Sequence, residues 1–161
     1  MNRFIRYQAA IIRDHRILLV MHREHATGQA RWVIPGGGRE PGETEEDCVR
    51  REMLEETALD VMVERLLLDD PGIPDDVYKR RKTYVCRVNN GEAKPGFDPE
   101  VEVAQVYQIA AVRWFDMRDP DSWEPGLRND PVTFPLLQRI RTILGYSTAD
   151  RDSLPFNQEN K

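Results

Sequence analysis

Runs of hydrophobic residues separated by polar turns predict several β-strands along the chain. Residues 4–12 and 16–21 are both rich in β-prone apolar side chains, and residues 13–15 between them favour a hairpin. Three further strand-like runs lie at residues 61–68, 82–88 and 101–116, of which the last may form two pieces. We therefore expect one sheet built from these segments.

Two segments carry helix signals instead. Thr44 is suited to an N-cap, acidic residues follow it, and Gly and Pro are absent for more than twenty residues, which predicts a helix over residues 45–58. Residues 131–146 repeat apolar side chains at helical spacing and predict a second helix packed on the sheet. The stretch 22–42 has few helix signals and ends in a glycine run, so we expect a loop there that allows close backbone approach. Strands and helices together predict an α/β fold.

Length and composition indicate one domain. The chain has 161 residues, and we expect residues 1–146 to form a single domain followed by a polar, mobile tail at 147–161. The formal net charge of -5 gives no general attraction to nucleic acid or to a membrane surface, and no apolar run is long enough to cross a bilayer. Cys48 and Cys86 match neither a disulfide framework nor a zinc site, and the N-terminal residues lack a signal-peptide pattern, so we expect a cytoplasmic protein.

The first predicted helix brings three carboxylates together. At 100° per residue, Glu52, Glu55 and Glu56 fall within about 100° of one another. Such a cluster repels itself unless a cation lies within it, and carboxylate oxygens suit Mg²⁺ or Mn²⁺. A solvated acidic face is the alternative, but it would need a clean apolar stripe opposite. That sector instead holds Leu54 together with the polar residues Asp47, Arg50 and Thr57. We therefore expect a helix buried against two layers, with its acids facing a cleft.

The spacing around these acids is specific. Gly37 is followed after five residues by Glu43, and Glu43 is followed after seven by the segment 51–59, REMLEETAL. This pattern resembles the Nudix hydrolase family, whose box reads Gly, five residues, Glu, seven residues, Arg-Glu, an apolar residue, any residue, Glu-Glu, any residue, Gly and an apolar residue. Ala58 alone departs from the box, because the family has glycine there. Alanine is less free to take the left-handed turn at a helix end, but no ligand is lost.

The resemblance implies a fold and a chemistry. The fold is an α/β/α sandwich with a mixed β-sheet between helices, and the reaction is attack of water on a phosphorus of a nucleoside diphosphate linked to another group. Glu52, Glu55 and Glu56 would hold Mg²⁺, with Mn²⁺ as the other candidate, and Arg51 would orient these carboxylates. Glu43 would brace the loop and helix or join the metal shell.

The general base varies in this family and can be a glutamate from a later loop. Relatives often place that glutamate where this chain has Gln108, and glutamine cannot act as a base. Glu100 and Glu102 lie shortly before it. The leading candidates for the base are therefore Glu52 and Glu100.

Substrate contacts are expected from the glycines and from cations. Gly37 and Gly38 would let the backbone approach the site, and Arg23 could reach a phosphate. Arg81, in the basic run 79–82, is the other cation expected to contact the substrate. The alternative is that this run is a group of solvated charges on an edge strand.

The substrate class stays open. Pro74 occupies a place that is typical of relatives acting on ADP-ribose and nucleotide sugars, whereas Tyr78 lies near a place typical of relatives acting on dinucleoside polyphosphates. Normal or oxidised nucleoside triphosphates are a third class. The substrate is in each case a small-molecule nucleotide, and the resemblance also implies a possible homodimer. The alternative is a non-catalytic Nudix-like module that binds a nucleotide as a sensor.

Overall fold

The computed structural model describes residues 2–97 and 101–146, and the expected mobile tail at 147–161 lies outside them. The strands are β1 (Asn2–Arg13), β2 (Arg16–Glu24), β3 (Ala30–Val33), β4 (Gly36–Arg39), β5 (Asp60–Pro71), β6 (Arg80–Asn90) and β7 (Tyr107–Asp116). The helices are α1 (Glu45–Thr57), α2 (Val101–Val106), α3 (Pro125–Arg128) and α4 (Thr133–Ile143), with a 3₁₀ turn η1 (Pro120–Ser122). Within these residues no helix has the length and apolar character needed to span a membrane.

The seven described strands form one mixed sheet. Its main order is β3-β2-β1-β6-β5, with β4 added to β1 and β7 added to β2. Strands β1 and β6 run parallel, and the other pairs are antiparallel. The predicted β1–β2 hairpin is confirmed, and its turn residues Asp14 and His15 both have positive φ, as a tight two-residue turn requires.

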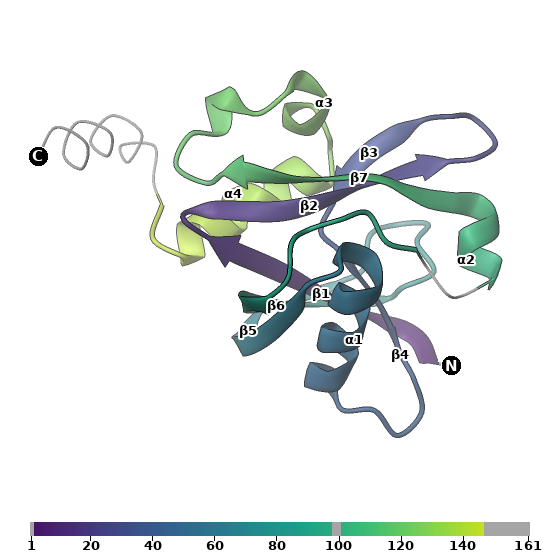
Figure 1. Cartoon of the computed structure of the whole chain (residues 1–161). Helices are drawn as coiled ribbons and strands as arrows, with labels where there is room; N and C mark the ends of the chain where they lie inside the picture. The colour runs from purple at the N-terminus through teal and green to yellow at the C-terminus, as the bar shows by residue number, and fades with distance from the viewer. Residues whose placement is uncertain (1, 98–100, 147–161) are drawn as a thin grey trace, which may run out of the picture.

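Two hydrophobic cores lie on the two faces of this sheet. Tyr7, Ala9 and Ile11 of β1 pack against buried residues of α1, whereas Ala10 belongs to the core shared with Leu137 and Ile140 of α4. The alternation follows from the two-residue period of a strand. Figure 1 shows α1 in front of the strands and α4 behind β2 and β7. The expected sandwich, with a mixed sheet between helices, is confirmed.

The glycine run forms a strand, which corrects the expected loop. Gly36 and Gly37 pair with Gln8 and Tyr7 of β1, so this segment is β4. A Cβ on Gly36 would lie 2.4 Å from the carbonyl oxygen of Tyr7. Glycine is therefore needed here because two backbones come closer than any side chain permits.

Two further expectations about the sheet are wrong. The first part of segment 101–116 is the helix α2, and pairing with β2 begins only at Tyr107. The carbonyl groups of Ala104 and Val106 accept hydrogen bonds from His25, which attaches this segment to the end of β2. The basic run is not on an edge strand, because β6 lies between β1 and β5.

Candidate active site

Helix α1 places Glu52 and Glu56 on the face that packs against the sheet. Thr44 caps the helix, as predicted, by accepting a hydrogen bond from the amide of Asp47 at 3.1 Å. Glu52 and Glu56 are buried on the same face as Val49 and Met53, whereas Leu54 is 59% exposed. The helix is therefore buried on one side only, which corrects the expectation of two covering layers.

Arg51 ties this helix to the loop before it. Its Nε and Nη2 donate to the two carboxylate oxygens of Glu43 at 2.7 and 3.0 Å, which is a bidentate pair. Nη2 also donates to the carbonyl of Gly38 at 3.0 Å. These bonds lower the pKa of Glu43 and fix the path of the chain between β4 and α1.

The same guanidinium binds two of the three carboxylates that were predicted to hold the metal. Nη1 of Arg51 donates to Glu52 at 3.1 Å and to Glu55 at 3.2 Å. The hydrogen bonds to Glu43 and the charges of Glu52 and Glu55 raise the pKa of Arg51 above its ordinary value. Arg51 therefore stays charged and sets where these carboxylates lie.

The backbone of β4 lies against the acids of α1. A Cβ on Gly37 would lie 2.4 Å from Oε1 of Glu52, and the amide of Gly36 donates to Oε1 of Glu56 at 3.3 Å. No side chain thus separates the carboxylates from this strand. The glycines were expected to let the backbone approach the site closely, and the groups that their backbone approaches are the carboxylates of Glu52 and Glu56.

The donor set suits a hard divalent cation. Glu52 and Glu56 are 3% and 1% exposed, lie one helical turn apart and offer only oxygen atoms. Among residues 2–97 and 101–146, no three acidic, histidine or cysteine side chains already form a group that could hold a metal. The residues still fit a metal in donor type, because Glu52 and Glu55 already converge on one guanidinium nitrogen of Arg51 and Glu56 lies one turn from Glu52.

Ala58 adopts the backbone conformation for which the box has glycine. Its φ and ψ are 62° and 16°, and its amide donates to the carbonyl of Leu54 at 3.1 Å. The helix end thus keeps the left-handed turn despite the Cβ, so the substitution leaves the path of the helix intact.

Replacing Ala58 with glycine is expected to stabilise the fold. Relief of the left-handed conformation, worth roughly 1–2 kcal/mol, outweighs the extra unfolded-state entropy of glycine, worth roughly 0.4–1 kcal/mol. Thermal unfolding should show a Tm higher by about 2 °C. Ala26→Gly is the matched control, because Ala26 lies in an exposed turn without a positive φ, and this variant should have a lower Tm. A lower Tm for Ala58→Gly as well would contradict the claim that Ala58 is strained.

A later segment covers the C-terminal end of α1. The amides of Lys94, Gly96 and Phe97 donate to the carbonyls of Thr57, Glu56 and Glu55 at 2.9, 2.9 and 3.1 Å. A Cβ on Gly96 would overlap the carbonyl oxygen of Glu55. The chain that leads toward Glu100 is thereby attached to the turn of α1 that carries the acids.

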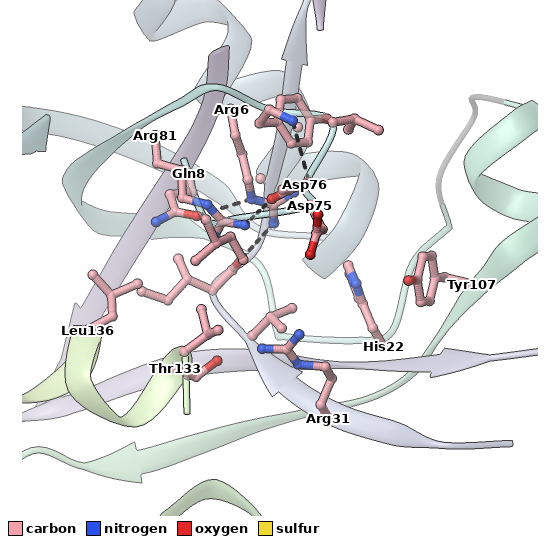
Figure 2. A pocket seen from close by; sticks show the side chains of 18 of the residues that line it. Arg6, Gln8, His22, Arg31, Asp75, Asp76, Arg81, Tyr107, Thr133 and Leu136 are labelled. Atoms are coloured by element: carbon pink, nitrogen blue, oxygen red, sulfur yellow. Dashed lines mark hydrogen bonds and ion pairs between the residues drawn. The ribbon is translucent and has the colours of Figure 1, made fainter. Parts of the chain in front are cut away.

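A cavity of about 610 Å³ opens on the other side of Gly36 and Gly37. Figure 2 shows Arg6, Gln8 and Arg81 on one side of it, with Arg31, His22 and Tyr107 across from them. The loop between β5 and β6, from Ile73 to Tyr78, and the start of α4 complete the lining. Its volume lies within the range of small-molecule sites.

Arginines outnumber carboxylates in the lining of the cavity, where Arg6, Arg31 and Arg81 stand against Asp75 and Asp76. Burial lowers the pKa of Arg81, and repulsion from Arg6 and Arg31 lowers it further. Burial and the same two arginines lower the pKa of His22 to about 3, so the ring is neutral at pH 7. The charges of Arg6 and Arg31 thus disfavour the charge of Arg81, and an anion bound among the three would favour it.

The neutral state of His22 makes stability depend on pH. Between the ordinary pKa of 6.5 and the folded value of about 3, the unfolded chain binds the proton and the folded chain does not. The free energy of unfolding should therefore fall as pH decreases below 6.5, by up to about 1.4 kcal/mol per pH unit from this residue. Denaturant unfolding of wild type and His22→Asn at pH 7.5 and 5.5 tests this. The variant should lose less stability between the two pH values, and equal losses would contradict the burial of a neutral ring.

The predicted site residues separate into groups. Arg51, Glu52, Glu55 and Glu56 lie together on α1, and Gly37 and Arg81 line the cavity. Gly38 contributes its carbonyl to Arg51. Arg23 is exposed on β2 and is not among the lining residues, and Glu100 lies outside the described residues. Gln108 lines a smaller neighbouring cavity with His25 and Phe97.

Sequence reasoning missed Arg6, Gln8, His22 and Arg31. The signal for the first two was present, because two polar residues at alternate positions of an otherwise apolar strand share one face. His22 and Arg31 needed the β2–β3 register, in which they are direct partners.

The comparisons with known proteins agree with this geometry. A family model described as NUDIX domain matches residues 4–133. The NAD-capped RNA hydrolase NudC of Vibrio atlanticus is 30% identical over 109 residues, which cover 67% of this chain and 35% of that protein. An oxidized purine nucleoside triphosphate hydrolase of Danio rerio is 26% identical over 143 residues, which cover 84% of this chain and 80% of that protein.

The solved structures show the same fold. A NUDIX hydrolase from Nitrosomonas europaea superposes with a TM-score of 0.66 at 20% identity, over 88% of this chain and 90% of that one. The chain spans less than half the length of the NudC relatives that it matches. Since the family model covers most of the chain, the chain belongs to the NUDIX domain family.

Proposed function

We propose that the chain is a metal-dependent pyrophosphohydrolase, which cleaves a nucleoside diphosphate linked to another moiety by attack of water on phosphorus. One observation carries this proposal. The buried carboxylates of α1 and a cavity of nucleotide size lined by three arginines share the bare backbone of Gly36 and Gly37. A cation bound by the acids would therefore adjoin a nucleotide bound in the cavity.

Each residue of the cluster has a proposed role. Glu52, Glu55 and Glu56 would hold Mg²⁺ or Mn²⁺, which when bound neutralises diphosphate charge and lowers the pKa of a coordinated water. Arg51 orients the carboxylates, as its bonds to Glu43, Glu52 and Glu55 support.

The general base is proposed to be Glu100 or Glu52. The attachment of Phe97 to the carbonyl of Glu55 supports Glu100, which follows three positions later. The burial of Glu52 among α1, Gly37 and Arg51 supports its role in holding the metal more strongly than a role as base.

The lining of the cavity and the names of the relatives determine which panel of compounds should be tested as substrates. Pro74 and Tyr78 both line the cavity, so nucleotide sugars, ADP-ribose and dinucleoside polyphosphates all belong in the panel. Structural neighbours are titled UDP-X diphosphatase and ADP-ribose pyrophosphatase, and relatives are named for oxidized purine nucleoside triphosphates and NAD-capped RNA. We propose a small-molecule nucleotide as the substrate and include a NAD-capped RNA as a comparison.

Chromatography of products after incubation with Mg²⁺, with and without a chelator, tests the proposal. Cleavage of one class at its diphosphate, abolished by the chelator, is the expected result. No cleavage of any compound, together with a rise in Tm on nucleotide binding, would overturn the proposal in favour of the non-catalytic binding module.

A further inference from the structure

Three arginines reach the cavity from three strands that lie far apart in sequence. Arg6 of β1 and Arg81 of β6 are register partners in the parallel pair, so their side chains share one face of the sheet. Arg31 of β3 is the register partner of His22 on β2, across the cavity. The arrangement therefore surrounds the cavity with cations and does not place them in one surface row (Figure 2).

The charges of these arginines are only partly compensated. Arg6 donates to the carbonyl of Ile34 at 2.8 Å and to Gln8, and no described carboxylate lies within ion-pair distance of it. Arg31 pairs with Asp130 at 3.1 Å while its side chain stays 44% exposed.

Arg81 carries an unused donor. One nitrogen, Nη2, binds Asp76 in the loop that closes the cavity, while its buried Nε has no acceptor in the described part of the chain. A buried guanidinium N–H without an acceptor costs free energy, and a phosphate oxygen would satisfy it.

These cations lie on the face of the sheet away from the carboxylates. Tyr7 and Ala9 of β1 pack toward α1, and Lys82 of β6 pairs with Glu45 of α1 at 3.0 Å. Arg6, Gln8 and Arg81 occupy the alternate positions, which point to the other face. The cluster around Arg51 and the three arginines are thus two separate charged sites, and one phosphate group would not fill both.

We propose that the cavity binds a second phosphate group of the substrate through Arg6, Arg31 and Arg81, and thereby selects nucleotides that carry a phosphate in addition to those of the cleaved linkage. The inference deepens the proposed function and rests on it for the position of the cleaved linkage. Asp76 binds Nη2 of Arg81, so a phosphate that binds Nε and Nη2 together replaces this carboxylate.

Binding of matched nucleotide pairs tests the proposal without requiring turnover. The pairs are NADPH and NADH, coenzyme A and dephospho-coenzyme A, and diadenosine tetraphosphate and triphosphate, whose members differ by one phosphate. Titration calorimetry with the whole chain in a chelator should show at least tenfold tighter binding of the more phosphorylated member of one pair. Arg81→Gln should reduce that preference below about threefold, because the loss of one charged hydrogen-bond partner removes most of the discrimination.

Arg80→Gln is the matched control. Arg80 is the preceding residue of β6, pairs with the exposed side chain of Asp69 and does not line the cavity. Its variant should keep the full preference. Equal loss in both variants, equal affinity within every pair, or no binding at millimolar concentration would each overturn the proposal.

A second comparison keeps the proposal independent of folding defects in Arg81→Gln. Asp76→Asn removes the negative charge that pairs with Arg81 and should tighten binding of the preferred nucleotide by more than Asp75→Asn does. Asp75 is in the same loop, also lines the cavity and has a φ of 67°, which asparagine tolerates. Equal effects of the two variants would overturn the claim that the phosphate replaces Asp76 on Arg81. Hydrolysis without a preference would leave the proposed function standing and overturn this inference, whereas a preference without metal-dependent hydrolysis would do the opposite.

Discussion

The Glu55→Gln variant is expected to keep its fold and lower kcat by roughly 10²- to 10³-fold, the effect of removing one group that stabilises charge in the transition state. Glutamine preserves the size of the side chain and one oxygen acceptor, but it removes the negative charge proposed to hold the metal. Of the two carboxylates of α1 that bind Arg51, Glu55 is the more exposed, with 21% of its side chain accessible against 4% for Glu52, so its neutralisation should disturb packing less. Steady-state kinetics at saturating Mg²⁺ measures the effect.

Glu46→Gln serves as the control for that prediction. Glu46 belongs to the same helix, but it is exposed in the first turn and away from Arg51. Its variant should retain wild-type kcat, and both variants should melt within a few degrees of wild type. A Glu55→Gln enzyme with unchanged kcat would remove Glu55 from the proposed machinery.

Arg51→Met is expected to destabilise the fold by about 3 kcal/mol, as is typical when one partner of a buried ion pair is removed. Methionine keeps the aliphatic bulk but leaves Glu43, Glu52 and Glu55 close together without their cation. Denaturant unfolding gives the change directly. Added Mg²⁺ should raise the stability of this variant more than that of wild type, since the acids then have no competing guanidinium.

The neighbouring Arg50→Met variant separates this effect from the general loss of a helix charge. Arg50 is 54% exposed, and its nearest acid is Asp60 at 3.8 Å. A pair of this kind contributes little, at most about 1 kcal/mol. Equal destabilisation by the two substitutions would contradict the central position of Arg51.

The sequence predicted the parts of the site that depend on local spacing. Thr44 and the acidic first turn located the start of α1, and the intervals between Gly37, Glu43 and Glu52 located the box. The helix wheel correctly placed Glu52 and Glu56 on one face. It did not reveal that this face is buried against β4, because the missing partner is a strand of glycines, which carries no hydrophobic signal.

Features that depend on pairing between distant strands were not predictable in the same way. Arg81 was singled out from its basic run, yet only the parallel register of β6 on β1 places it beside Arg6. The apolar residues of segment 101–106 favoured a strand, whereas this segment forms α2 and contacts His25 at the end of β2. Ala58 shows the converse, since the fold imposes a left-handed conformation that its own side chain disfavours.

Hydrolysis in ¹⁸O-labelled water with Mg²⁺ tests the central claim most directly. For whichever nucleotide of the panel is cleaved, mass spectrometry should find one ¹⁸O atom on a phosphate of one product, none on the other, and no products in the presence of a chelator. Label on a carbon-linked hydroxyl, or products formed equally well with the chelator, would contradict metal-dependent attack of water on phosphorus.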